Sequence, residues 1–340
     1  MQNICSQVRP GLLRFFLAMV VVLHHSFPIR LGAWAVGMFF VLSGYWIARM
    51  WVEKYSLLPS PYGSFVTSRW WRLAPLFLTV QLLAVVLMYL GLPMGGREAI
   101  SNLGWWVTQP LVIGSTQFSR LLPPSWSLDL EMQFYLIAPL MVIGLGALSG
   151  RARLGPVLGM FGWGILLMAS GISLETPRLD LYAWLFGVGI LASLSRWDPP
   201  ANLQTGCAAV LILGVLVTMA IPASRELVWR SGNQINRLSP FWGHAFFVAI
   251  VSTGIPVALG SVFRKSGKID RWLGDLSYPL YLFHWIPREW YYSQVDWTQS
   301  GWRNGILLVT NIGVAVLGAV ILLHVVDRPA QRLKERFLNR

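Results

Sequence analysis

Ten long apolar runs, separated by mostly short connections, determine what this chain can fold into. Most of the runs hold about 17 to 22 residues, which is enough for a helix to cross a hydrocarbon core of about 30 Å. Only 12% of the 340 residues are charged, about half the fraction found in soluble domains. The sequence therefore predicts an all-α, polytopic integral membrane protein. Its ten expected transmembrane helices lie at residues 11–28, 33–52, 73–91, 132–149, 155–173, 179–195, 205–221, 241–262, 272–290 and 303–326.

The basic residues predict how the chain is threaded through the membrane. When the connections are assigned alternately to two sides, 18 of the 27 lysines and arginines fall on one side and nine on the other. Because cytoplasmic loops carry the excess of basic residues, we expect both termini in the cytoplasm. The formal charge of +13 fits this loop pattern better than a nucleic-acid-binding surface, so no nucleic-acid partner is expected.

Residues 99–115 are the ambiguous segment of the chain. They are long enough to span, but a crossing there would place two basic clusters, at 151–153 and 264–271, on the outer side, against the charge rule. We therefore expect an interfacial or re-entrant segment, with Trp105 and Trp106 at the level of the lipid headgroups.

The rest of the chain gives no sign of a second domain. The longest connection is an outer loop at about 92–131, and long loops are more often functional than short ones. No stretch is long or polar enough for a separate soluble domain, so we expect one transmembrane domain over 1–340. The first apolar run lacks a clear cleavage site and is interpreted as a retained helix. Cys5 and Cys207 are too few and too far apart to suggest a metal site or a disulfide framework.

Two ionisable residues in the first run indicate a functional site. Arg14 and His25 are eleven residues apart, so on one helix they share a face while differing in depth by about 16 Å. Such residues are costly in a membrane helix unless they face a polar interior. A neutral imidazole can accept a proton from a hydroxyl and return it, which makes His25 a candidate catalytic residue. The alternative is a histidine that only hydrogen-bonds between helices.

Two carboxylates lie at the outer end of the fourth run. Asp129 and Glu131 are two residues apart, so only one of them is expected to point inward. We favour Glu131, which could orient His25 and stabilise its charged form; the alternative is a carboxylate placed at a helix N-terminus by the dipole. Trp126, with the tryptophans of the outer loop, could form a sugar-stacking surface, although interface anchoring is the simpler explanation.

Two arginines begin the third run on the inner side. Arg69 and Arg72 are three residues apart, so they share a helical face and can hold a phosphate with paired donors. Taken alone, they are more simply explained as a cytoplasmic anchor. With Arg14 on the same side, however, they could bind a phosphorylated cofactor whose long arm reaches outward. His284 in the ninth run is expected at a depth similar to that of His25.

Six motifs, spread in order over nearly the whole chain, resemble the acyltransferase-3 family. Each motif is weak alone, and their order carries the resemblance. They are Arg14 with His25, the run Phe39-Phe40-Val41-Leu42-Ser43-Gly44-Tyr45, Arg69-x-x-Arg72, Trp126-Ser127-Leu128 leading to Glu131 and Phe134-Tyr135, Ser277-Tyr278 with Tyr281-Leu282 and His284, and Asp327-Arg328-Pro329.

The resemblance implies an integral membrane enzyme that moves an acyl group, usually acetyl, from cytoplasmic acyl-CoA to a hydroxyl of an extracytoplasmic or lipid-linked polysaccharide. It implies that His25 is catalytic, that Glu131 is an essential acid near the acceptor, and that no cofactor or metal is permanently bound. The implied donor-site residues are Arg14, Arg69 and Arg72, and the implied supporting or acceptor-side residues are Ser43, Trp126, Asp129, Tyr281 and His284. The expected setting is the bacterial cytoplasmic (inner) membrane, with membrane lipids, the glycan acceptor and polysaccharide-assembly proteins as partners.

The chain departs from the family pattern at two places. The family often has two adjacent glutamates where Met132 follows Glu131 here, and it usually has glutamate where this chain has Asp327. Some relatives carry a fused esterase-like domain, which is not expected here. The alternative functions are a transporter or flippase for a lipid-linked glycan, an acyltransferase for lipid or protein, and a scaffold in a polysaccharide-export complex.

Overall fold

The computed structural model describes residues 8–118, 121–172, 178–229, 240–295 and 302–338. Within these ranges the regular elements are helices, so the predicted all-α class is confirmed. The α-helices are α1 (Pro10–Ser26), α2 (Gly32–Glu53), α3 (Pro61–Tyr89), α4 (Arg97–Ser101), α5 (Leu103–Thr108), α6 (Trp126–Ala147), α7 (Leu154–Ala169), α8 (Leu179–Leu194), α9 (Ala201–Ala220), α10 (Pro240–Ser261), α11 (Lys268–Phe283), α12 (Trp285–Gln294), α13 (Trp302–Leu322) and α14 (Arg328–Leu338).

Each of the ten predicted runs lies on one of these helices or on a pair of them. Seven helical stretches of the described chain are long and apolar enough to cross a membrane. Two more predicted runs correspond to α1 and α8, which are apolar but only 17 and 16 residues long. The chain is therefore built for several membrane crossings, as its composition predicts.

The ninth predicted run, 272–290, is two helices rather than one. α11 ends at Phe283 and α12 begins at Trp285, with His284 between them. Pro287 explains the break, because it has no N–H to donate to the carbonyl of Phe283 one turn earlier. The interruption lies at His284, and apolar patterning alone does not reveal it.

Two helices begin earlier than their apolar runs. α3 starts at Pro61 instead of residue 73, and α6 starts at Trp126 instead of residue 132. Both extensions carry polar side chains that face the protein interior, so hydropathy does not mark them as membrane helix. The last run also continues further, because a π-helical turn at Leu323–Asp327 joins α13 to α14.

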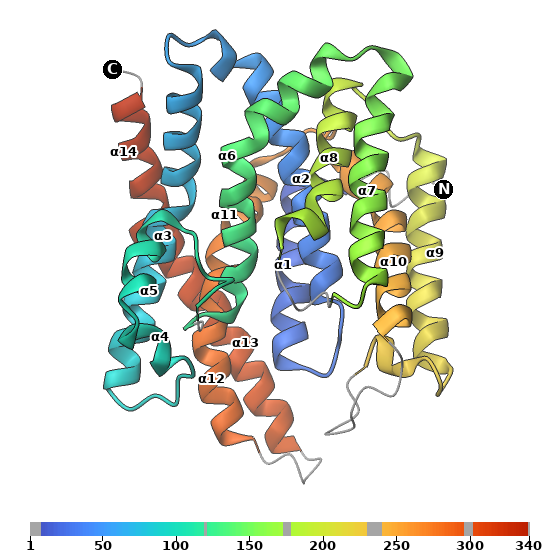
Figure 1. Cartoon of the computed structure of the whole chain (residues 1–340). Helices are drawn as coiled ribbons and strands as arrows, with labels where there is room; N and C mark the ends of the chain where they lie inside the picture. Colours follow the sequence, from blue (N-terminus) through green and yellow to red (C-terminus); the bar gives the residue numbers. More distant parts are fainter. Residues whose placement is uncertain (1–7, 119–120, 173–177, 230–239, 296–301, 339–340) are drawn as a thin grey trace.

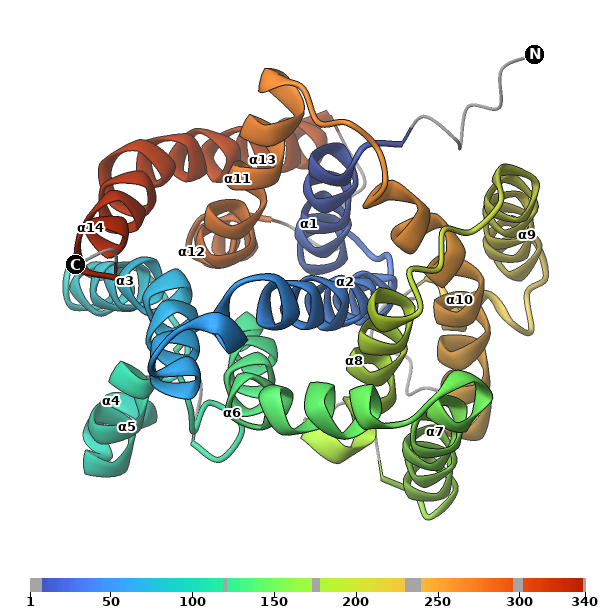
Figure 2. The ribbon, with the colours of Figure 1, turned by 90° about the horizontal axis from the view of Figure 1, so that it is seen from above.

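Helix α2 lies at the centre of the bundle. Viewed from above, α1, α6, α8 and α10 surround it, while α7 and α9 lie at the periphery (Figure 2). Its packing against α8 depends on two glycines that let the backbones touch. A Cβ on Gly44 would lie 2.2 Å from the carbonyl oxygen of Phe186, and one on Gly189 would lie 2.1 Å from that of Val41. The helix that carries Ser43 is thereby fixed in place.

The close contact between α2 and α8 makes Gly189→Ala strongly destabilising. Its added methyl would overlap the carbonyl of Val41, and neither helix can move apart without opening the core. The matched control is Gly214→Ala in α9, where a Cβ meets nothing within 4 Å. That variant should be as stable as the parent, since alanine favours a helix by about 0.5–1 kcal/mol over glycine. Thermal unfolding in detergent measures both, and equal melting temperatures would contradict this packing.

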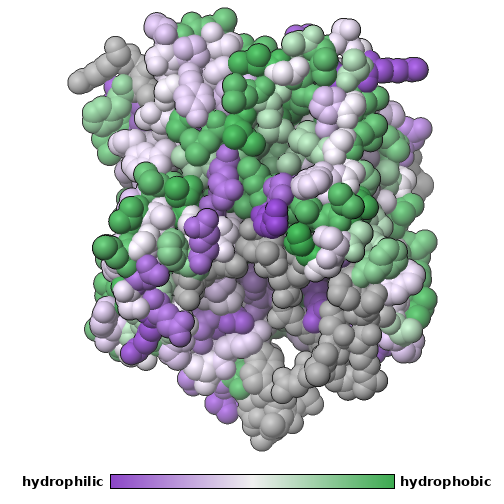
Figure 3. All heavy atoms as spheres, viewed as in Figure 1, coloured by the Kyte–Doolittle hydropathy of each residue, from purple (hydrophilic) through white to green (hydrophobic). Residues whose placement is uncertain are grey.

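The outer helices present apolar side chains to their surroundings. α9 is the extreme case, since only 11% of the residues in its apolar stretch are buried. Its exposed side chains include Val210, Leu213 and Leu216. Hydrophobic residues also cover much of the face in Figure 3. Exposed apolar surface on this scale is typical of helices that face lipid.

The segment 99–115 has no helix long enough to span. α4 and α5 contain five and six residues, and they lie beside α3 in Figure 1. Trp70 of α3 donates its indole N–H to the carbonyl oxygen of Pro110 at 2.8 Å. The chain therefore folds back along α3, as a re-entrant segment does.

The two tryptophans of this segment have different surroundings. Trp106 is half exposed, which suits a headgroup contact, but Trp105 is only 3% exposed. Trp105 is therefore packed into the core rather than open to lipid, and the headgroup level expected for both tryptophans stays a prediction.

Candidate active site

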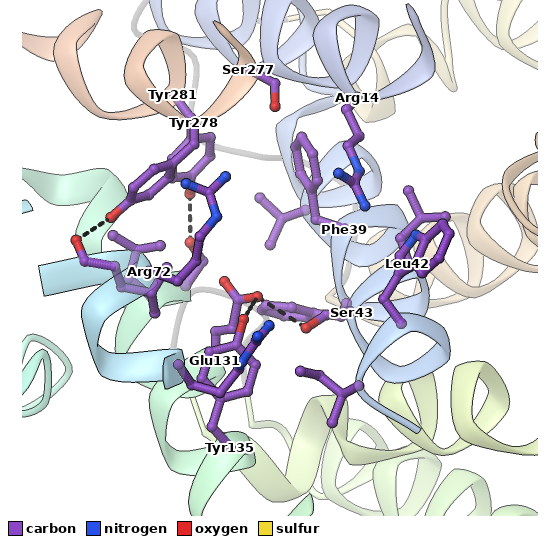
Figure 4. Close-up of a pocket in the computed structure, with 18 of the residues that line it drawn as sticks. Arg14, Phe39, Leu42, Ser43, Arg72, Glu131, Tyr135, Ser277, Tyr278 and Tyr281 are labelled. Atoms are coloured by element: carbon purple, nitrogen blue, oxygen red, sulfur yellow. Dashed lines mark hydrogen bonds between the residues drawn. The ribbon is translucent and has the colours of Figure 1, made fainter. Parts of the chain in front are cut away.

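A cavity of about 440 Å³ opens inside the bundle, with α1, α2, α3, α6 and α11 forming its wall. Figure 4 shows arginine, carboxylate and phenol side chains pointing into it. Its polar lining residues are Arg14, Ser43, Trp46, Arg69, Arg72, Ser127, Glu131, Tyr135, Ser277, Tyr278 and Tyr281. Residues from five helices thus meet in one space, as the sequence predicts for the three arginines.

The three arginines are held in different ways. Arg69 is 9% exposed, and its Nη2 donates to the hydroxyls of Tyr55 and Ser68, each at 3.3 Å. Arg72 pairs with Asp327 at 3.2 Å. The guanidinium of Arg14 lies 5.9 Å from the ring centroid of Trp46. Only Arg72 has a carboxylate within salt-bridge distance in the described chain.

Two buried donors in the cavity have no acceptor among the described residues. They are Nε of Arg69 and Nε1 of Trp46, and both residues line the cavity. Buried donors in native proteins are almost always paired. With three arginines against the single carboxylate of Glu131 in its lining, the cavity is suitable for an anionic ligand rich in acceptor oxygens.

Glu131 lies in the arginine cavity rather than beside His25. Its Oε1 accepts hydrogen bonds from the hydroxyls of Ser43, at 3.0 Å, and Tyr135. The bond from Ser43 joins α6 to the central helix α2, whereas Tyr135 lies on α6 itself (Figure 4). The structure thus shows the partners of this carboxylate oxygen, and the expected role of Glu131 in orienting His25 stays a prediction.

His25 lies at the far end of α1 in a cluster of rings. Its ring is nearly parallel to that of His284, with the centroids 5.4 Å apart and an interplanar angle of 23°. Trp285 meets it edge-on at 5.1 Å, and Arg288 donates from Nε to its backbone carbonyl at 3.2 Å. The structure thus brings together two histidines that are far apart in the sequence but were expected at similar depth.

Tyr281 lies between the cavity and the histidines. Its hydroxyl hydrogen-bonds to that of Ser127 at 2.6 Å and donates to the carbonyl of Pro124 at 3.0 Å. The centroid of its ring is 6.2 Å from that of His284. His25 itself is not part of the cavity lining, so Tyr281 and His284 connect the arginines to His25.

Two residues expected near the acceptor have structural contacts. Asp129 is 1% exposed and accepts from the backbone N–H of Thr116 and the side chain of Gln133, both at 2.8 Å. It therefore anchors the outer loop to α6. Trp126 packs edge-on against Phe40, with centroids 6.2 Å apart, and against Tyr182. It is half-buried against the core, and its expected place on the acceptor side stays a prediction.

Several residues in the cavity wall or directly behind it escape reasoning from sequence alone. Asp327 is the clearest, because its pairing with Arg72 crosses 255 positions of sequence and its neighbour Arg328 is the obvious local partner. Trp46 is another, since its place in an apolar run gives no hint of a polar role. Tyr135 could have been found, because it follows Glu131 by four residues and so shares its helical face.

The pairing between Arg72 and Asp327 predicts that a second substitution, at Asp327, restores the stability lost in a variant of Arg72. Arg72→Gln should lower the melting temperature, because it leaves the carboxylate of Asp327, only 6% exposed, without its cation. Loss of such a charged hydrogen bond costs about 1–3 kcal/mol. The double variant Arg72→Gln/Asp327→Asn removes the buried charge and should recover most of the loss. A double variant no more stable than the single one would contradict the pairing.

The matches to known proteins cover the region of the chain that forms the cavity. A family model described as an acyltransferase domain, that of acyltransferase family 3, matches residues 9–325, which include every residue that lines the cavity. A Bacillus subtilis (strain 168) protein provisionally named peptidoglycan O-acetyltransferase YrhL is 26% identical over 315 residues, covering 81% of this chain and 47% of that protein. The chain thus spans about half the length of this relative. No solved structure matches this chain.

Proposed function

The chain belongs to the acyltransferase-3 family, and from this premise we propose that it is a membrane O-acyltransferase. It takes an acyl group, acetyl in the simplest case, from acyl-CoA on the cytoplasmic side. It transfers the group to a hydroxyl of an extracytoplasmic or lipid-linked polysaccharide. The setting proposed is the bacterial cytoplasmic membrane, with ten crossings and both termini inside.

The cavity is the observation that carries the proposal. Three arginines converge there, and phosphate oxygens are acceptors that paired guanidinium donors hold well. At the other end of the cavity, Tyr281 contacts His284, whose ring lies against that of His25. A donor with a phosphorylated end and a long uncharged arm matches this layout.

His25 supplies the chemistry in the proposed reaction. As a general base, it takes the proton of the acceptor hydroxyl while the hydroxyl oxygen attacks the thioester carbonyl. The new C–O bond forms, the C–S bond breaks, and the CoA thiolate recovers the proton. In the other route, the imidazole attacks the thioester first, releases CoA and passes the acyl group to the hydroxyl.

The acceptor is proposed from the relative's name and from the topology. That name specifies peptidoglycan as the glycan and acetyl as the group. The relative is about twice as long, and the half of it that this chain does not match can carry part of the relative's specificity. For this chain, the proposed acceptor class is an extracytoplasmic polysaccharide or its lipid-linked precursor.

A labelling assay tests the proposed function. The purified protein in detergent is mixed with acetyl-labelled CoA and peptidoglycan fragments, and free CoA and base-labile acetyl ester are measured. We expect both products in equal amounts, and only when donor and glycan are present together. If acetyl-CoA stays intact in this assay, the same protein is placed in vesicles with the glycan. Movement of the glycan across the vesicle membrane would then indicate a transporter.

A further inference from the structure

A second pocket adjoins the arginine cavity. It has a volume of about 470 Å³ and lies between the start of α1, the start of α11 and Arg328 of α14. Arg14 and Trp46 line both the pocket and the cavity. We call it the basic vestibule, and its charged lining residues are Arg14, Lys268, Arg271, Asp275 and Arg328.

The floor of the basic vestibule is a rigid helix crossing. A Cβ on Gly274 of α11 would lie 3.1 Å from the Cα of Gly11 of α1, so the two backbones are in contact. Asp270 fixes the crossing, since it accepts from the backbone N–H groups of Gly11 and Leu12 at 3.2 and 2.8 Å. Its charge is occupied there and does not neutralise the vestibule.

The vestibule carries an excess of positive charge. Its single carboxylate, Asp275, lies 3.8 Å from Arg328, and both side chains are partly exposed, so this ion pair is weak. Lys268 and Arg271 are exposed and form no salt bridge within the described part of the chain. An anion can therefore bind these cations without displacing a strong internal partner.

Basic residues on this side are expected from the topology, so charge alone does not define a site. A second basic pocket, lined by Arg9, Arg264 and Lys265, has a similar volume of about 540 Å³. It shares no residue with the arginine cavity. Only the basic vestibule can hold one end of a ligand whose other end reaches the cavity.

We infer that the basic vestibule binds the nucleotide end of the acyl-CoA donor, with Lys268 and Arg271 facing its 3′-phosphate. This inference rests on the proposed function and deepens it. Coenzyme A joins a 3′-phosphorylated nucleotide to a long uncharged arm through a diphosphate. With the nucleotide in the vestibule, the diphosphate passes Arg14 at the junction and faces Arg69 and Arg72, and the arm continues through the cavity toward Tyr281.

Removal of one phosphate from the ligand tests the inference. Binding of CoA and of dephospho-CoA, which lacks only the 3′-phosphate, is measured by calorimetry on the purified full-length protein. The wild type should bind CoA at least about tenfold more tightly, since charged hydrogen bonds to phosphate are worth that much. In Lys268→Ala/Arg271→Ala, the preference should fall close to one, because CoA binding weakens while dephospho-CoA binding is unchanged.

Lys265→Ala is the matched control, since it removes a lysine from the other basic pocket and should keep the preference. The inference is overturned if the wild type binds both ligands equally, if the double variant keeps its preference, or if Lys265→Ala loses it. Failure of the proposed function looks different, because the wild type would then bind neither CoA nor dephospho-CoA. A double variant that still binds dephospho-CoA normally is folded, so its loss of preference reports the phosphate contact.

Discussion

His25→Ala is expected to reduce acyl transfer by a factor of about 10² to 10⁴, the usual contribution of a general base. The ring of His25 lies near the end of α1, against His284 and Trp285. It does not line the cavity, so CoA binding should be unchanged. Acetyl ester formation and CoA binding are measured on the same preparation.

The neighbouring histidine provides a control for this prediction. In His24→Asn, the amide can still donate to the carbonyl of Ile29, which His24 contacts at 2.8 Å. This variant should keep its activity within about threefold. If His25→Ala stays fully active, or if both variants lose activity equally, His25 is not the catalytic group.

Arg69→Gln is expected to raise the KM for acetyl-CoA by about tenfold to a hundredfold, with a smaller change in kcat. Arg69 is buried, lines the cavity and has a buried Nε without a partner among the described residues. A charged hydrogen bond to a phosphate is worth about 1.5–3 kcal/mol, which corresponds to that range of affinity. Steady-state kinetics with varied acetyl-CoA at saturating glycan measures the effect.

Arg49→Gln is the matched control for Arg69→Gln. Arg49 is a cation of α2 that is exposed, pairs with Glu53 at 3.0 Å and does not line the cavity. Its loss should leave the KM unchanged. An unchanged KM in Arg69→Gln, or an equal rise in Arg49→Gln, would contradict a donor site at the three arginines.

The sequence predicts the membrane helices well because lipid imposes a simple rule. A spanning segment must be apolar and must satisfy its own backbone hydrogen bonds, so the runs on α2, α9 and α10 are visible without any structure. The break between α11 and α12 is not, because it depends on Pro287 and on one polar residue inside an apolar run. The early start of α3 is also missed. Its first turns carry polar residues that face the cavity, so they do not read as part of an apolar run.

The site is predicted only as far as helix geometry reaches. The spacing of Arg14 and His25 places them on α1 at two depths, and the spacing of Arg69 and Arg72 places both in one cavity. Spacing cannot show which residues of distant helices meet. The hydrogen bond from Ser43 of α2 to Glu131 of α6 is therefore seen only in the structure.

The same limit applies to the expected acceptor residues. Asp129 and Trp126 lie near Glu131 in the sequence, and both are expected on the acceptor side, although Asp129 and Glu131 are not expected to share a helical face. Their side chains leave α6 in other directions, toward the outer loop and toward the core around Tyr182. A helix turns by about 100° per residue, so residues close in sequence on a helix often serve different surfaces.

Transfer across a sealed membrane tests the central claim most directly. Vesicles are prepared with the cytoplasmic face outward and the glycan acceptor trapped inside, and acetyl-labelled CoA is added only outside. The account predicts labelled acetyl ester on the trapped glycan, while the released CoA and the unreacted acetyl-CoA stay outside. The labelled ester should be absent in His25→Ala. Label that reaches glycan only when donor and acceptor share one side of the membrane would contradict it.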